Sequence, residues 1–261
     1  MSKPLKFSLN LSLIFREYTV FDRFQKASDA GFKAVEIQFP YETSAEDLKR
    51  GLDAAGIQMV LFNVGAGDLM QGGEGIAAVP EKKEQFRHAV DLALSYAKVL
   101  SPRVINVLPG RAYRLANRKQ YLDTLEDNLR FAAGVFSTLG IKTVFEAANT
   151  FDMPDFLIHS GRQLLDMLQR VNHPNLYIQY DIYHMTRMEQ DVICFIKSNI
   201  DKIGHFQFAD APGRGQPGTG GIDFKLVFDA IANTDYSGWL GAEYKPTGLS
   251  KDSLGWFEAF S

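Results

Sequence analysis

The chain has 261 residues, of which 46% are apolar and 23% are charged, and its net charge is −3. This is an ordinary globular composition, and about 250 residues are typical of a single (β/α)8 barrel. The slight net negative charge does not favour binding to nucleic acid. The sequence also lacks an apolar run of about twenty residues, the length that a membrane span requires. We therefore expect one domain over residues 1–261, with no nucleic-acid partner and no membrane partner.

The N-terminal segment resembles a secretory leader only superficially. An apolar run spans residues 7–15, but Ser8, Asn10 and Ser12 interrupt it at every second position, and no small-residue cleavage site is visible. Alternation of this kind is typical of a strand. We interpret residues 7–15 as the first strand.

Cysteine occurs once, at Cys194. A lone cysteine cannot form an internal disulfide, and this usage fits a reducing cytoplasm. We expect a cytoplasmic protein in which the Cys194 thiol is a small core residue rather than a nucleophile.

A helical pattern that ends in glycine and leads directly into a short apolar strand recurs along the chain. These glycines are Gly31, Gly56, Gly140, Gly204 and Gly238. We expect each to supply a left-handed residue at a helix-to-strand joint. Residues 103–108 and 176–180 show the same β-rich run without the glycine. With the first strand this gives eight strands, so the sequence predicts an α/β fold, a single (β/α)8 TIM barrel.

Two glycine-rich loops follow predicted strands, over residues 65–80 and 210–221. Loops after barrel strands lie on the catalytic face and often act as lids. A surface loop without a function is the alternative for both segments.

Four oxygen-bearing side chains lie at or near the C-terminal ends of predicted strands: Glu146, Asp181, Gln207 and Glu243. The C-terminal strand ends of a parallel barrel open onto one face, so these side chains should converge there. A lone carboxylate at such a position is more often a helix cap or a solvated loop residue. Four together, flanked by apolar residues, need a compensating cation or a hydrogen-bond network. An all-oxygen set favours Mg²⁺, or Mn²⁺, over zinc or copper.

Short strings over almost the whole chain resemble the hydroxypyruvate isomerase family of xylose isomerase-like barrels. They are NLS (10–12), FPY (39–41), EAAN (146–149), YDIYHM (180–185) followed by RME (187–189), HFQFAD (205–210) and GAEYKP (241–246). The related 2-oxo-tetronate isomerases differ in the YDIYH segment and are the alternative.

The resemblance implies a barrel in which two glutamates exchange protons with the substrate beside a divalent metal. Matched motif to motif, Glu146 and Glu243 take the acid and base roles, and Asp181 and Gln207 complete the metal shell with them. Related ketose epimerase barrels have a histidine at the position of Gln207, which leaves the need for a metal open. The implied reaction, in glyoxylate metabolism, interconverts hydroxypyruvate and tartronate semialdehyde through a cis-enediolate, whose charge a metal and donors such as His184 stabilise.

A substrate that carries a carboxylate needs a cation within reach. The candidates are Arg214, Lys245 and Arg187, and for each a solvated surface charge is the alternative. Arg214 is preferred, because the guanidinium fork fits a carboxylate and its flanking glycines let the backbone approach a ligand. His184 lies three residues after Asp181 and is expected to hydrogen-bond to the substrate.

Other polar residues of the predicted strands have two interpretations each. Asn10, Asn63 and Glu36 either contact substrate or water at the barrel mouth or satisfy buried backbone groups. His205 lies two residues before Gln207, on the same side of the strand, and we interpret it as a core histidine.

Two rival classes are weaker. A metal-dependent DNA endonuclease would need a basic groove and more than the 5 histidines of this chain. A non-catalytic sugar-acid binding protein would not need two opposed glutamates. We therefore expect a small hydroxy-oxo acid as the partner and leave a homo-oligomer open.

Overall fold

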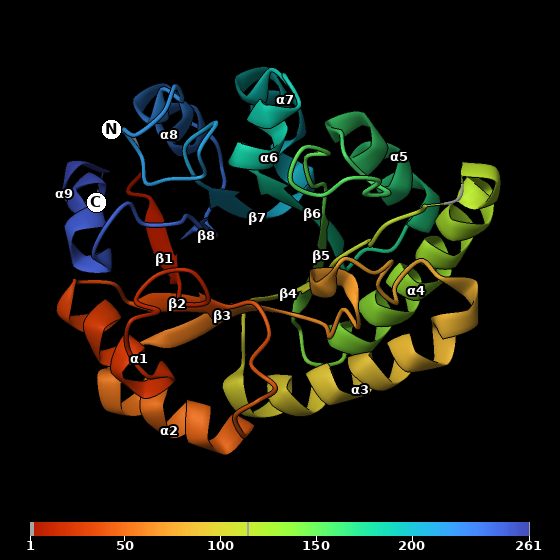
Figure 1. Cartoon of the computed structure of the whole chain (residues 1–261), viewed down its shortest axis with the longest axis horizontal. Coiled ribbons are helices and arrows are strands. Elements are labelled where there is room, and N and C mark those ends of the chain that lie inside the picture. Colours follow the sequence, from red (N-terminus) through yellow and green to blue (C-terminus); the bar gives the residue numbers. More distant parts are fainter. Residues whose placement is uncertain (1–2, 114, 261) are drawn as a thin grey trace.

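The part of the chain that the structure describes, residues 3–113 and 115–260 of a computed structural model, forms a closed barrel of eight parallel strands (Figure 1). Each strand pairs with the next in chain order, and β8 pairs with β1 to close the sheet. The strands are β1 (Lys6–Asn10), β2 (Ala34–Ile37), β3 (Gln58–Asn63), β4 (Val104–Val107), β5 (Lys142–Glu146), β6 (Leu176–Asp181), β7 (Ile203–Phe208) and β8 (Trp239–Ala242). The predicted TIM barrel is confirmed.

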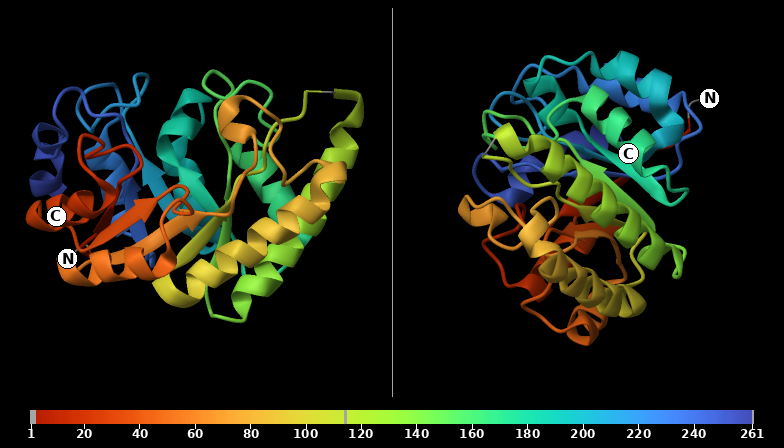
Figure 2. Two further views of the ribbon diagram at one scale, coloured as in Figure 1. Left: turned by 60° about the horizontal axis from the view of Figure 1, so that its bottom comes forward. Right: turned by 90° about the vertical axis from the view of Figure 1, so that its right-hand side faces the viewer.

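Helices connect the strands and surround the barrel, as Figures 1 and 2 show. They are α1 (Val20–Asp29), α2 (Ala45–Ala55), α3 (Lys83–Leu100), α4 (Arg118–Ser137), α5 (Gly161–Val171), α6 (Ile182–Arg187), α7 (Val192–Asn199), α8 (Phe224–Ala232) and α9 (Gly255–Phe260). The 3-10 turns are η1 (Leu69–Gln71), η2 (Pro80–Lys82), η3 (Leu115–Asn117), η4 (Ile200–Lys202) and η5 (Ser250–Ser253). Among the described residues, no helix combines the length and the apolar character that crossing a membrane requires.

The joints between helices and strands depend on glycine in two different ways. Gly31, Gly56 and Gly140 have positive φ angles, as predicted for residues that close a helix. Gly204 and Gly238 do not, so the prediction of a left-handed conformation is wrong for them. A Cβ atom on Gly204 would lie 2.8 Å from a side chain of the neighbouring strand β6. These two glycines are required by close packing rather than by backbone conformation.

The first strand is shorter than predicted and ends at Asn10 instead of continuing to residue 15. The carbonyl oxygen of Asn10 accepts hydrogen bonds from the backbone N–H groups of Leu13 and Ile14, which turns the chain. The Asn10 side-chain oxygen also accepts the N–H of Ser12 at 3.0 Å. The alternating polar residues therefore form a turn beyond the strand, because their side chains compete for backbone donors.

The prediction that Cys194 is a core residue is wrong, because its side chain is exposed on α7. The buried face of this helix consists of Val192, Phe195 and Ile196. These positions follow the three-and-four spacing of a helix stripe, and residue 194 falls outside it.

Candidate active site

The C-terminal ends of the strands enclose a cavity of about 60 Å³. Five predicted site residues line it: Glu146, His184, Gln207, Arg214 and Glu243. The other lining residues are Gln38, Phe39, Asn63, Met70, Leu108, Ala148, Met153, Phe156 and Gln179. Side chains from distant parts of the sequence thus meet at one small opening, as the parallel barrel requires.

A larger hollow of about 780 Å³ lies where the strands begin, lined by residues such as Lys6, Lys142 and Trp239. Conserved chemistry in TIM barrels belongs to the C-terminal face, whereas the opposite face serves stability. The smaller cavity is therefore the candidate active site.

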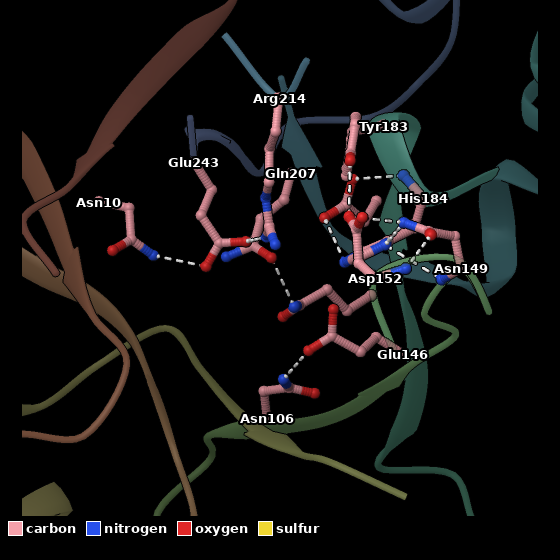
Figure 3. A network of polar contacts seen from close by, with 12 residues as sticks. Asn10, Asn106, Glu146, Asn149, Asp152, Tyr183, His184, Gln207, Arg214 and Glu243 are labelled. Carbon is pink, nitrogen blue, oxygen red and sulfur yellow. Dashed lines mark hydrogen bonds and ion pairs between the residues drawn. The ribbon is translucent and has the colours of Figure 1, made fainter. Parts of the chain in front are cut away.

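Glu243, directly after β8, has its charge compensated by several donors (Figure 3). Its Oε2 accepts from Arg214 Nη2 at 2.6 Å. Its Oε1 accepts from Asn10 Nδ2 at 3.0 Å and from Gln38 Nε2 at 2.7 Å. Burial raises the pKa of Glu243 to about 7, against the lowering effect of Arg214.

Glu146, the last residue of β5, is buried with far less compensation. Its Oε1 accepts from Asn106 Nδ2 at 2.7 Å. Burial, together with the negative charges of Glu243 and Asp181, raises the pKa of Glu146 to about 8. The two glutamates thus line the same cavity (Figure 3), and the charge of Glu243 acts on Glu146.

Asp181 ends β6 and begins α6. Its Oδ1 accepts the backbone N–H of His184 at 3.1 Å, which caps the helix. Burial raises the pKa of Asp181, although Arg214 opposes the shift. Ligand atoms of Glu146, Asp181 and His184 all lie within 4.8 Å of one another, a grouping that could hold a metal ion. Glu243 lies outside this grouping of carboxylate and imidazole ligands, and the predicted metal roles of Gln207 and Glu243 stay predictions.

His184 is buried beside a network at the cavity rim (Figure 3). Its Nδ1 lies 3.1 Å from the backbone nitrogen and 2.7 Å from the side-chain Nδ2 of Asn149. Its Nε2 lies 3.7 Å from Asp181 Oδ2. Burial, with the positive charge of Arg214, holds the pKa of His184 well below its usual value.

Glu36 forms the centre of a polar layer below the cavity. Its Oε1 accepts from Ser8 Oγ at 2.6 Å and lies 2.8 Å from His205 Nε2. Its Oε2 accepts from Gln207 Nε2 at 2.8 Å. Although burial opposes it, contact with His205 lowers the pKa of Glu36. His205 is therefore a satisfied core histidine, as predicted, and Glu36 lies beneath the mouth rather than at it.

Gln207 is oriented by this layer. Its Nε2 donates to Glu36, and its Oε1 accepts from Gln179 Nε2 at 2.8 Å. An amide oxygen has two lone pairs, so Gln207 Oε1 retains one that can bind a further partner.

The three predicted substrate cations have different surroundings. Arg214 lies in the cavity, and its Nε is buried with no hydrogen-bond partner among the described residues. The Lys245 side chain is exposed, and its backbone N–H donates to the Arg214 carbonyl at 2.8 Å. The guanidinium of Arg187 lies 4.7 Å from the ring centre of Phe151. Of the three, Arg214 is the one that lines the cavity.

Both glycine-rich loops contribute to the mouth. The first places Met70 in the cavity wall, and the second carries Arg214. Asp210 orders the second loop, because its carboxylate accepts backbone N–H groups from Gly218, Gly220 and Ile222 at 2.8 to 3.0 Å.

Arg111 ties the first loop to the loop after β5. Its Nη1 donates to the carbonyls of Leu69 and Gly73 at 2.8 and 2.9 Å, and its Nε donates to the carbonyl of Pro154 at 3.2 Å. The guanidinium is buried between these segments.

Sequence reasoning missed four residues of the site: Gln38, Asn106, Asn149 and Gln179. Asn106 and Gln179 each interrupt an otherwise apolar predicted strand, and a buried amide at such a place needs partners. These interruptions are the sequence signal that could have identified the two residues as part of the site. Asn149 lies within the EAAN string, but nothing in the string itself indicates its contact with His184.

Comparison with known proteins gives consistent matches over the chain. The model of the xylose isomerase-like TIM barrel family matches residues 24–260. The hydroxypyruvate isomerase of Escherichia coli (strain K12) is 42% identical over 256 residues, which cover 98% of this chain and 99% of that protein. The 2-oxo-tetronate isomerase of Pectobacterium atrosepticum is 38% identical over 253 residues, 97% of each chain. A solved structure described as AP endonuclease, family 2, from Brucella melitensis is 34% identical, has a TM-score of 0.94 and covers 100% of this chain and 99% of that one.

The chain therefore belongs to the xylose isomerase-like TIM barrel family. Within it the chain groups with the hydroxypyruvate and 2-oxo-tetronate isomerases, and it is an enzyme of the isomerase class. The resemblance inferred from the short strings is confirmed.

Proposed function

We propose that the chain interconverts hydroxypyruvate and 2-hydroxy-3-oxopropanoate (tartronate semialdehyde) through a cis-enediolate. The observation that carries the proposal is the meeting of Glu146 and Glu243 in one small cavity, with pKa values raised to about 8 and about 7. General acid–base transfer works best when the pKa lies near the working pH. Two such carboxylates suit the removal and return of a carbon-bound proton.

The reaction moves one hydrogen from C3 to C2. A carboxylate, Glu146 or Glu243, removes the C3 proton, and the electron pair of the C–H bond forms the C2–C3 double bond while the C2 carbonyl oxygen becomes an oxyanion. That oxygen takes up the proton that the C3 hydroxyl loses. The other carboxylate, or the same one, then returns a proton to C2, where the electron pair of the C2–C3 double bond forms the new C–H bond while the C3 oxyanion becomes the aldehyde carbonyl.

Arg214 is proposed to bind the substrate carboxylate. Its Nη2 donates to Glu243, but a guanidinium has five N–H donors, and the Arg214 Nε is buried with no partner in the part of the chain that the structure describes. Binding at Arg214 would fix the three-carbon chain beside both glutamates.

A divalent cation, Mg²⁺ or Mn²⁺, is proposed to bind Glu146 and Asp181, with Gln207 and Glu243 completing the ligand set. The residues fit such an ion, because burial raises the pKa values of Glu146 and Asp181, and the negative charges of Glu243 and Asp181 add to the rise at Glu146. Their oxygen atoms are the ligands that hard cations prefer. When bound, the ion supplies Lewis-acid stabilisation of negative charge on the substrate oxygens.

A four-carbon 2-oxo-tetronate substrate is the second candidate, because a relative with that name is 38% identical. The substrates differ by about one carbon and a hydroxyl, a difference that pockets discriminate only modestly. A nuclease function is not favoured, because the chain carries a net charge of −3.

We further propose that residues 1–261 work as one catalytic domain and that the protein is cytoplasmic. The family match over residues 24–260 supports the first point, and the single cysteine supports the second.

Turnover of hydroxypyruvate and of four-carbon 2-oxo acids, with and without a chelator, tests the proposal. We expect hydroxypyruvate to be converted and its C3 hydrogen to exchange with deuterium from the solvent, and we expect the chelator to slow both. Binding of these acids without turnover or exchange would refute the isomerase mechanism.

A further inference from the structure

Asn149 has an amide group whose orientation is fixed by its own loop. Its Oδ1 accepts the backbone N–H groups of Phe151 at 3.1 Å and Asp152 at 2.9 Å. A flipped amide would set an NH₂ group against these two donors. The Asn149 Nδ2 therefore faces Asp152 Oδ2 at 3.1 Å and His184 Nδ1 at 2.7 Å.

His184 Nδ1 thus faces two donors from the same residue, the Nδ2 and the backbone N–H of Asn149 at 3.1 Å. A ring nitrogen that accepts hydrogen bonds carries no hydrogen, and a neutral imidazole has one hydrogen to place. That hydrogen must lie on Nε2, which makes Nε2 a donor. The imidazolium form, with hydrogen on both nitrogens, is excluded by the same contacts.

We propose that Asn149 is a positioning residue that fixes His184 in its Nε2–H tautomer, so that His184 donates a hydrogen bond to the developing substrate oxyanion and is not a metal ligand. Metal-ligating histidines usually donate through their second ring nitrogen to a carboxylate or carbonyl, whereas here the second nitrogen accepts. His184 therefore acts as a hydrogen-bond donor rather than as a metal ligand, although its ring lies within the grouping of side chains that could hold a metal ion. The inference rests on the proposed function only in naming the oxyanion.

Long-range ¹H–¹⁵N correlation spectra of protein labelled with ¹⁵N-histidine test the tautomer directly. The chain has 5 histidines, and the His184→Gln variant identifies the signals of residue 184. We expect His184 to show an unprotonated Nδ1 and a protonated Nε2, with and without added Mg²⁺. A hydrogen on Nδ1 in the wild-type protein, or loss of the Nε2 hydrogen when Mg²⁺ is added, would overturn the proposal.

Two variants separate positioning from a general structural role. Asn149→Asp replaces the donor with an acceptor, so we expect a hydrogen on His184 Nδ1 and a fall in kcat of roughly 10²-fold, the usual effect of losing one oxyanion donor. Asn149→Ala keeps the backbone N–H, so the tautomer should persist, with a fall in kcat of roughly fivefold for a lost neutral hydrogen bond. Asn117→Asp, which adds the same charge at the start of α4, should match the wild type.

Retention of the wild-type His184 spectrum in folded Asn149→Asp would contradict the assigned role of Asn149. If that variant does not fold, the spectra of the wild type and Asn149→Ala still decide whether Nδ1 accepts. If the wild type fails to isomerise hydroxy-oxo acids while its spectrum is as expected, the proposed function fails and the tautomer assignment stands.

Discussion

The two sides of the cavity treat the same chemical group in different ways. Glu243 receives hydrogen bonds from Arg214, Asn10 and Gln38, one of them charged. Glu146 receives one from Asn106 and is repelled by the charges of Glu243 and Asp181. Both carboxylates end buried strands, so burial raises both pKa values, but the pKa of Glu146 is higher.

This difference shows which charge the folded protein leaves uncompensated. The Glu243 side carries its own cation, and the Glu146 side has negative charge that an external cation would stabilise. If the proposed divalent ion binds there, it would compete with a proton for Glu146, and metal binding would depend on pH.

The largest expected effect comes from removing either acid–base group. Glu146→Gln and Glu243→Gln should each lower kcat by roughly 10³-fold, because an amide cannot carry the transferred proton. Turnover and solvent deuterium exchange measure the change, and the exposed Glu42→Gln is the matched control. Near-normal turnover in either variant would mean that the two sides do not share the proton transfer.

Replacing Arg214 leaves Glu243, like Glu146, without a charged hydrogen-bond donor among the described residues. Arg214→Met should lower kcat/KM by roughly 10²-fold, mainly through KM, because the substrate carboxylate and Glu243 both lose a charged donor. Lys245→Met removes an exposed cation nearby and should have little effect on KM. Equal losses of kcat/KM in the two variants would contradict the proposal that Arg214 binds the substrate carboxylate.

The pH dependence of stability measures the uncompensated charge on the Glu146 side. The pKa of Glu146 rises from 4.5 to about 8 on folding, so between these values the folded chain holds a proton that the unfolded chain has released. Its contribution to stability is complete below about pH 4.5 and is lost as the pH rises through about 8. In chelator, Glu146→Gln should therefore exceed the wild type in free energy of unfolding by a few kcal/mol at about pH 8.

Urea unfolding at about pH 5 and about pH 8 gives this comparison. Added Mg²⁺ should stabilise the wild type at the higher pH and narrow its gap to Glu146→Gln, because an ion that binds the folded state stabilises it by mass action. If the free energy of unfolding of the two proteins depends on pH in the same way in chelator, the negative charge of Glu146 is already compensated within the folded protein.

The smallest expected effect comes from the Asn106 side chain that donates to Glu146. Asn106→Leu removes a hydrogen bond to the charged carboxylate, so the pKa of Glu146 should rise and the acidic limb of the pH–rate profile should move up by roughly half to one unit. Asn233→Leu, an exposed site, is the control. A limb that stays in place would assign that ionisation to a different group.

Much of the fold follows from local sequence. Glycines at helix ends and short apolar runs predict the alternation of helices and strands, and the shared direction of the strands predicts that Glu146 and Glu243 meet. The first strand was predicted too long because a period of two is also compatible with polar side chains that bind backbone in a turn. Cys194 was misplaced because the average burial of cysteine does not indicate which side of a helix the residue occupies.

The hydrogen-bond partners of the site residues could not be predicted from the sequence. Alternation indicates that Glu36 and Gln207 point into the barrel, but their contact depends on the stagger between strands that are not adjacent in the chain. Asn149 illustrates the same limit, because its contact with His184 crosses from the loop after β5 to α6. Such pairs are set by the closed geometry of the barrel rather than by local propensity.

The buried guanidinium of Arg111 has a consequence for the shape of the mouth. Because it donates to carbonyl groups of two separate loops, displacement of either loop from the opening would break hydrogen bonds of a buried charged group. Losing such bonds costs more than losing bonds between neutral groups, so this contact favours a mouth whose two loops keep one arrangement.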